Sequence, residues 1–145
     1  MNIRDGLYGG APGHAFGVPY EFLARNVVEE KIQGHMIGNG SHNQDKGTWS
    51  DDTSMTLCLL DNLEEEINYK AIMESFVQWY KKGIYTANGV CFDIGRGTKN
   101  ALKRYINGIT PIKCGSKRIN NNGNGSLMRC VPIIYYMYYW KKGIQ

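Results

Sequence analysis

The chain has 145 residues and a formal net charge of +4, and 42% of its residues are hydrophobic. This length allows one domain with a real core, and the apolar content excludes an intrinsically disordered chain. No run of 18 apolar residues occurs, and no apolar stretch follows the first residues, so we expect neither a transmembrane helix nor a signal peptide. Basic residues are scattered rather than gathered in a stripe, which argues against nucleic-acid binding. We therefore expect residues 1–145 to form a single domain.

The cysteines and histidines form no metal-binding pattern. The four cysteines are widely spaced and include no Cys-x-x-Cys pair: Cys58, Cys91, Cys114 and Cys130. This spacing is typical of reduced thiols in a cytoplasmic protein and argues against a zinc site or a disulfide framework. The histidines show no metal-ligand spacing either, and we expect a structural or exposed position for each of His14, His35 and His42.

The first predicted helix begins near Ile3 and is rich in glycine. Small residues recur at intervals of three and four, at Gly6, Gly9, Gly10, Gly13 and Gly17. Such a face lets a second backbone approach closely, and the cost of each mid-helix glycine, about 0.5–1 kcal/mol, implies a packing reason. Pro12 predicts a kink in this helix. Val18-Pro19-Tyr20 predicts an extended segment, with Glu21 at its exit.

The rest of the chain alternates helical patterns with polar loops. Hydrophobic periodicity predicts helices over residues 53–64, 69–82 and 98–105, and from about residue 127 to 140. Gly83 ends the second of these, after two lysines that suit a helix C-terminus. The polar, glycine-containing composition predicts a loop or a short helix over residues 26–46. It predicts loops over residues 88–97 and 115–126. No two runs alternate at period two, so we expect an all-α fold, a compact orthogonal helical bundle.

The stretch Ser50-Asp51-Asp52-Thr53 packs two carboxylates and two hydroxyls immediately before the best helical pattern, in which Met55, Cys58, Leu59 and Leu63 share one face. One interpretation is an N-cap, because these side chains accept free N–H groups and acids favour the positive end of a helix. The other is a metal site. Mg²⁺ and Mn²⁺ prefer carboxylate and hydroxyl oxygens, and a cation would offset the repulsion between two adjacent acids.

Three further features carry candidate functional residues. Residues 120–129 read Asn-Asn-Asn-Gly-Asn-Gly-Ser-Leu-Met-Arg, a small-residue loop that feeds the last predicted helix. Such a loop suits a phosphate, although the same composition also suits a flexible surface turn. Asp93 lies between apolar neighbours and is either the N-cap of the following helix, which we favour, or a buried functional carboxylate. Glu21 is either a surface acid or a carboxylate that supports or gates a site.

Three motifs, taken in order, resemble the ADP-ribosylglycohydrolase family. Residues 9–22 resemble its opening Gly-Asp-Ala-x-Gly-x-Pro-x-Glu-Phe helix, and residues 47–55 resemble its Thr/Ser-Asp-Asp-Thr-x-Met metal motif. Residues 123–132 resemble its Gly-Asn-Gly-Ser-x-Met-Arg-x-x-Pro ligand loop, and Asp93-Ile94-Gly95 matches a fourth, weaker stretch. On this resemblance we place the metal interpretation of the acidic motif above the cap.

The resemblance implies an all-α hydrolase that uses a pair of Mg²⁺ or Mn²⁺ ions to cleave the glycosidic bond joining ADP-ribose to an acceptor side chain. It implies metal ligands at Ser50, Asp51 and Asp52. It also implies that the diphosphate lies against Gly123, Asn124, Gly125 and Ser126. Carboxylates near the ribose would stabilise the positive charge of the transition state, so the catalytic candidates are Glu21, Asp52 and, for positioning water or substrate, Asp93.

Three departures from the family pattern define the alternatives. His14 stands where the family usually has Asp, Pro12 is out of pattern, and no Asp or Glu follows Met128. Family members continue further and supply the remaining metal ligands from a second acidic cluster, Asp-x-Asp-Thr. We therefore expect the N-terminal half of such a domain: either a truncated or split gene product, which a second chain could complete, or a natural short form. The expected partner is an ADP-ribosylated protein or a small molecule containing ADP-ribose. The alternative to the hydrolase function is a non-catalytic ADP-ribose-binding module or an inactive remnant.

Overall fold

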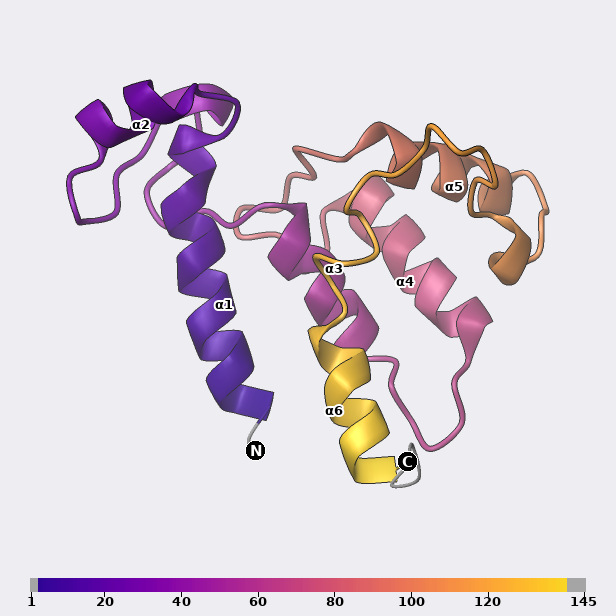
Figure 1. Ribbon diagram of the computed structural model, residues 1–145. Helices are drawn as coiled ribbons and strands as arrows, with labels where there is room; N and C mark the ends of the chain where they lie inside the picture. The colour runs from indigo at the N-terminus through magenta and orange to yellow at the C-terminus, as the bar shows by residue number, and fades with distance from the viewer. Residues whose placement is uncertain (1–2, 141–145) are drawn as a thin grey trace.

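The computed structural model describes residues 3–140, and within that range the secondary structure is helical (Figure 1). The α-helices of this part of the chain are α1 (Ile3–Gly17), α2 (Arg25–Lys31), α3 (Asp51–Leu60), α4 (Tyr69–Lys82), α5 (Arg96–Ile106) and α6 (Val131–Trp140). Short 3₁₀ turns lie between them, at η1 (Val18–Tyr20), η2 (Gly40–His42) and η3 (Pro111–Lys113). Between residues 3 and 140 the only β pairing is an isolated bridge from Asn39 to Gln44. The predicted all-α fold is confirmed.

Helix α3 is the central element, because α1, α4 and α6 all pack against it (Figure 1). The core lies mainly between α3 and α4 and is completed by α5, with the buried side chains Met55, Cys58, Leu59, Ile72, Phe76, Trp79 and Leu102. Three of the four residues predicted to share one face of α3 are therefore buried, and Leu63 packs against the same cluster from just beyond the helix end. Burying each large apolar side chain stabilises the fold by roughly 1.5–3 kcal/mol.

Helix α4 begins and ends where the sequence predicts. The Asn68 side chain accepts a hydrogen bond from the Ala71 backbone N–H at 3.0 Å, which caps the first turn. Gly83 ends the helix in the left-handed conformation, with φ at +66°. A Cβ atom at Gly83 would lie 1.9 Å from the Gly89 carbonyl oxygen, so the following loop folds back over this glycine. The loop that carries Asp93 thus leaves α4 in a fixed direction.

Helix α1 differs from its prediction in two ways. It runs without interruption from Ile3 to Gly17 and keeps Pro12 inside it, and the three residues after it form η1 rather than an extended segment. Of the small residues on α1, Gly6 is the one whose Cβ would meet another element, at 3.2 Å from the Tyr135 hydroxyl of α6. A Cβ at the other glycines of this stripe, Gly9, Gly10, Gly13 and Gly17, would meet nothing within 4 Å.

The C-terminal helix begins later than predicted. Residues 124–129 form turns, in which the Asn124 carbonyl accepts hydrogen bonds from the N–H groups of Leu127 and Met128 at 2.8 and 3.1 Å. Helix α6 starts only at Val131, and Tyr135 and Tyr136 are buried while the aromatic residues after them are exposed. Among residues 3–140, no helix has the length and apolar content needed to cross a bilayer. The four cysteines are free thiols, as predicted.

Candidate functional site

The junction of η1 and η2 brings Glu21 against His42. Gly40 adopts a φ of +64° and approaches η1 so closely that a Cβ there would lie 2.2 Å from the Pro19 carbonyl oxygen. The Ser41 hydroxyl donates a hydrogen bond to the backbone carbonyl of Glu21. His42 Nε2–H then donates to Glu21 Oε2 at 2.5 Å. The His42 side chain is 15% exposed and that of Glu21 is 32% exposed, so this contact is largely shielded from water.

Asp93 reaches the same histidine from the loop between α4 and α5. Its Oδ1 lies 3.6 Å from His42 Nε2, and its side chain is 17% exposed. The N-cap of α5 is Gly95, so the preferred interpretation of Asp93 as a helix cap is wrong and the alternative of a functional carboxylate stands. Glu21, His42 and Asp93 each offer one ligand atom, and these atoms lie within 4.8 Å of one another.

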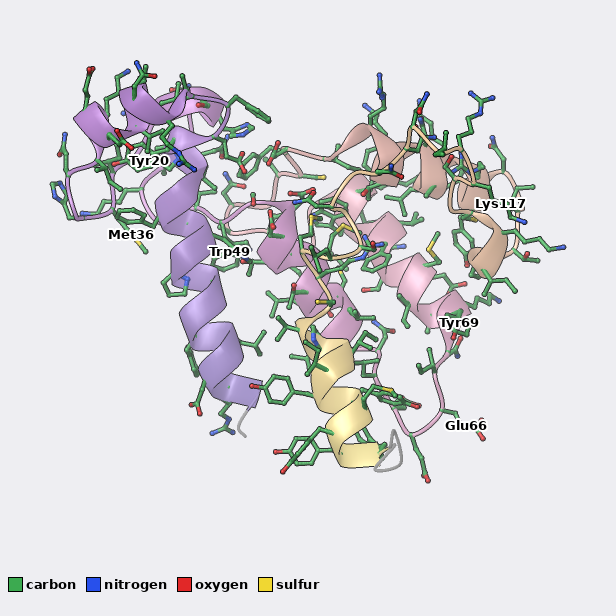
Figure 2. The ribbon with its side chains drawn as sticks, viewed as in Figure 1. Tyr20, Met36, Trp49, Glu66, Tyr69 and Lys117 are labelled. Atoms are coloured by element: carbon green, nitrogen blue, oxygen red, sulfur yellow. The ribbon has the colours of Figure 1, made fainter. Side chains whose placement is uncertain are left out.

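The acidic motif forms the first turn of α3. Ser50 occupies the N-cap position, but its hydroxyl makes no capping hydrogen bond and instead donates to Asp52 Oδ2 at 3.0 Å. Ser50 and Asp51 are almost completely buried, at 3% and 5% exposure. Figure 2 labels Trp49, which immediately precedes this turn, and its indole N–H donates to the Tyr85 carbonyl at 3.1 Å. This contact holds the acidic turn against the loop that leads to Asp93.

One cavity of about 590 Å³ brings the predicted site residues together. Its carboxylates come from three separate segments: Glu21, Asp51, Asp52 and Asp93. The lining also includes residues 120–126, the start of α5 and Arg129. Ser50 lies behind the lining and reaches it through Asp52. A second cavity of about 530 Å³, between α4, α5 and η3, contains a single carboxylate, Glu74, so we place the functional site in the acidic cavity.

The carboxylates destabilise one another's charged forms. Burial raises the pKa of Asp51 from 3.8 to about 7, with further contributions from the charges of Asp93, Asp52 and Glu21. Burial also raises the pKa of Glu21 from 4.5 to about 6, assisted by a hydrogen bond with Asp93 and opposed by His42. Within the described range, the basic group within 4.0 Å of these carboxylates is His42. The cavity therefore carries more negative charge than its own side chains neutralise.

The polar side of the cavity combines the asparagine–glycine loop with the beginning of α5. Gly123, Asn124 and Ser126 are exposed, and a Cβ at Gly125 would lie 2.9 Å from the Thr98 hydroxyl oxygen. The loop leads into α6, as predicted, and also lies directly on the first turn of α5. The N–H groups of that turn have no intrahelical partner and favour an anion. The residues at the start of this helix, Gly95-Arg96-Gly97-Thr98, were not among the predicted binding residues, although their glycines were visible in the sequence.

Arg129 connects the polar side of the cavity to the core. Its guanidinium carbon lies 4.7 Å from the centroid of the Phe76 ring, and its Nη1 donates to Met55 Sδ at 3.1 Å. Burial lowers the pKa of Arg129, while the charge of Asp51 acts in the opposite direction. A planar guanidinium can stack on an aromatic ring and keep its charge facing the carboxylates, which a lysine ammonium does less well.

The histidines divide into three situations, which their spacing alone does not distinguish. His35 is exposed, as predicted, and contacts only the nearby Gln33 carbonyl among the hydrogen bonds of the described residues. His14 Nδ1 lies 2.6 Å from Thr53 Oγ1, directly behind the acidic turn. His42 is half-buried and belongs to the carboxylate cluster, a position that its spacing does not indicate. Sequence reasoning missed it because Glu21, His42 and Asp93 meet only through tertiary packing.

The fold and the cavity define an all-α protein with a clustered-carboxylate site facing a glycine-rich loop. A sequence profile of the ADP-ribosylglycohydrolase family matches residues 2–143, so the chain belongs to this family. The chain is 36% identical over 131 residues to ADP-ribosylarginine hydrolase Tri1 of Pseudomonas putida (strain GB-1), covering 89% of this chain and 34% of that protein. It is 35% identical over 136 residues to the protein of the same name from Serratia proteamaculans (strain 568), covering 89% and 35%. The chain thus spans about a third of the length of these relatives.

Proposed function

We propose that this chain forms the substrate site of a metal-dependent hydrolase that cleaves the glycosidic bond between ADP-ribose and a protein side chain. One observation carries the proposal: four carboxylates from three separate segments line the same cavity as the asparagine–glycine loop. Such a cavity offers an acidic end for a sugar and its bound cation and a donor-rich end for a diphosphate. We further propose that residues 1–145 act as one domain in this role, and the free thiols suit the expected cytoplasmic location.

The donor set at the acidic end fits a hard divalent cation such as Mg²⁺ or Mn²⁺. The candidate ligands are all oxygens, from the Ser50 hydroxyl and the Asp51 and Asp52 carboxylates. Ser50 Oγ and Asp52 Oδ2 lie 3.0 Å apart, close to the separation of about 3 Å between neighbouring oxygens around an octahedral Mg²⁺ ion. Asp51 is buried beside three other carboxylates, and the Gly95 backbone and the charge of Arg129 offset only part of that cost, which adds a reason for a cation here. When bound, such an ion supplies Lewis-acid chemistry at the ribose.

The remaining carboxylates suit the chemistry at the anomeric carbon. Cleavage of a glycosidic bond passes through a transition state with positive charge on the sugar ring. Glu21 and Asp52 would stabilise that charge, and the low exposure of the cavity wall strengthens the interaction. Asp93 lies on the same side of the cavity, where its carboxylate can orient a water molecule or a ribose hydroxyl.

The opposite end of the cavity suits the diphosphate. Gly123, Asn124, Gly125 and Ser126 offer backbone N–H groups and polar side chains, and the first turn of α5 adds its own unpaired N–H groups. The positive end of the α5 dipole also favours a negatively charged diphosphate near this turn.

The relatives support an arginine side chain as the acceptor, because both bacterial relatives are named ADP-ribosylarginine hydrolases. The test is to incubate the 145-residue chain with an ADP-ribosylated arginine peptide and, separately, an ADP-ribosylated serine peptide. ADP-ribose release is measured with Mg²⁺, with Mn²⁺ and with a chelator. We expect release from the arginine peptide only when a divalent ion is present.

Two variants make this test specific. Asp52→Asn should lower the release rate by about 10²-fold or more, because it removes a charge that acts on the transition state. Asp45→Asn is the matched control, since Asp45 is exposed and does not line the cavity. A chain that binds ADP-ribose in calorimetry without releasing it would support the non-catalytic binding module instead. A chain that neither binds nor releases ADP-ribose would overturn the proposed function.

A further inference from the structure

We propose that His42 is a positioning residue that holds Glu21 and Asp93 in fixed places at the mouth of the acidic cavity. The structural part of this proposal depends only on the geometry of the cluster. Its effect on turnover rests on the proposed function, in which Glu21 acts at the ribose. Nothing in the spacing of His42 along the sequence indicates this role, which arises where η2 meets η1 and the loop before α5.

Two aromatic rings lie beside the imidazole, one from Phe22, which is 85% exposed, and one from the half-buried Phe92. The ring centroid of His42 lies 5.6 Å from that of Phe22, in an edge-to-face arrangement, and 5.4 Å from that of Phe92. Each phenylalanine is the direct neighbour in sequence of one of the two carboxylates. Two pairs of neighbouring residues, Glu21-Phe22 and Phe92-Asp93, therefore each place one carboxylate and one aromatic ring next to His42.

The backbone supports this arrangement at some cost. Phe22 and Asp93 have φ values of +60° and +56°, in the left-handed region that non-glycine residues rarely adopt. Asn43, next to His42, has a φ of +49°. Residues held in such conformations persist when surrounding contacts fix them, most often at functional sites. Here the strained residues lie on all three segments that meet at the imidazole.

The hydrogen bonding gives the imidazole its effect on the carboxylates. Its Nε2–H donates to Glu21 at 2.5 Å, and the same nitrogen lies 3.6 Å from Asp93. Without the imidazole, Glu21 would keep only its hydrogen bond with Asp93, which requires a proton on one of the two carboxyls. When both are ionised the like charges repel, and Glu21 would turn away from Asp93 towards solvent. With His42 present, both carboxylates keep their positions on the cavity wall.

This role predicts an effect on turnover rather than on ligand affinity. His42 is not among the residues that line the cavity, and the loop over residues 120–126 that would hold the diphosphate is outside its cluster. A displaced Glu21 would lose its alignment with the sugar while the diphosphate contacts remain. Loss of a partner that orients a reacting group lowers activity by about 10- to 100-fold.

The first experiment measures the protein alone, in the presence of a chelator. The side-chain carboxyl ¹³C resonance of Glu21 is compared in the wild type, His42→Leu, His42→Gln and His35→Leu. We expect a shift in His42→Leu, a return towards wild type in His42→Gln because the amide again offers an N–H donor, and no change in the exposed control His35→Leu. In the wild type, the His42 ring protons should also show nuclear Overhauser contacts to both Phe22 and Phe92.

A Glu21 resonance that does not respond to His42→Leu in a folded protein would overturn the proposal. If that variant does not fold, the absence of ring contacts to Phe22 and Phe92 in the wild type would overturn it equally. The second experiment measures ADP-ribose release from the arginine peptide. We expect kcat of His42→Leu to fall by about 10- to 100-fold with KM near wild type, and His42→Gln to recover part of the loss. A wild-type chain without turnover would count against the proposed function, while the resonances still decide the position of Glu21.

Discussion

Replacing Asp51 with asparagine should stabilise the metal-free protein at neutral and alkaline pH. Asp51 is 5% exposed, and burial together with the charges of Asp93, Asp52 and Glu21 raises its pKa to about 7. Folding above that pH therefore places an unfavourable negative charge next to three other carboxylates. Asparagine has nearly the same shape and carries no charge, so it removes this cost.

The magnitude follows from the difference between the two states. In the unfolded chain Asp51 ionises near its ordinary pKa of 3.8, whereas in the folded protein its pKa is about 7. The folded state thus binds a proton that the unfolded state has lost, so the stability of the wild type falls as the pH rises from about 4 to 7. The full cost applies above pH 7 and amounts to at most about 4 kcal/mol, at 1.36 kcal/mol for each pH unit. Near pH 4 the two proteins should be equally stable.

The assay is urea denaturation of the wild type and Asp51→Asn at pH 4 and pH 8, with a chelator and then with Mg²⁺ or Mn²⁺. With the chelator at pH 8, the variant should have the higher free energy of unfolding. The divalent ion should reduce this advantage of the variant, because binding at 100 times Kd stabilises the wild type by about 2.7 kcal/mol and the variant much less. The exposed Asp45→Asn should behave like wild type throughout. A variant less stable than wild type at pH 8 with the chelator would refute the reasoning.

Three further substitutions test the packing around the cavity. Gly40→Ala places a Cβ 2.2 Å from the Pro19 carbonyl oxygen, whereas the control Gly34→Ala, at a similar φ, meets open space. Thermal denaturation should therefore show Gly40→Ala to be less stable than Gly34→Ala by about 1–3 kcal/mol. Equal melting temperatures of the two variants would contradict this prediction. Gly125→Ala should weaken ADP-ribose binding about tenfold, because its Cβ would clash with the Thr98 hydroxyl. In calorimetry, adding Thr98→Ala should restore the affinity, and a double variant that binds as weakly as Gly125→Ala would exclude the clash. Arg129→Lys should lower the free energy of unfolding by about 1 kcal/mol through loss of ring stacking, and an unchanged urea midpoint would exclude that contribution.

Local signals in the sequence are strong enough to predict helix α4 in full. Its amphipathic pattern, the Asn68 cap and the left-handed Gly83 all depend on residues within a turn of one another. The four-residue error at the start of α6 arises from local turns. Leu127 and Met128 continue the apolar pattern, but their N–H groups bond to the carbonyl of Asn124 in tight turns. Periodicity does not distinguish such turns from the first turn of a helix.

At Pro12 a strong local signal, the proline that predicts a kink, does not end the helix. Proline in a helix interior lacks one hydrogen bond and usually bends or breaks the helix. Here α1 nonetheless remains helical from Ile3 to Gly17, while it packs against α3 and α6. The short 3₁₀ turn after it then redirects the chain, and this turn places Glu21 where η2 can reach it.

The candidate site could be predicted residue by residue but not as an arrangement. The motifs supplied Glu21, Asp51, Asp52 and the loop over residues 123–126, and the structure collects them around one cavity. Their chemical roles remain predictions. The motifs did not supply His42, because its neighbours are set by contacts between segments far apart in the chain. Asp93 illustrates the same limit, since its apolar flanks suit a helix cap as well as the turn that it actually makes.

The wide separation along the chain of the segments that line the cavity has a kinetic consequence. Glu21, Asp51, Asp93 and Asn124 become neighbours only after long stretches of intervening chain are ordered, and closing such loops costs entropy before any contact compensates for it. The cavity is therefore expected to mature late, after the α3–α4 pair has formed. A ligand bridging these segments would slow unfolding and leave the refolding rate nearly unchanged.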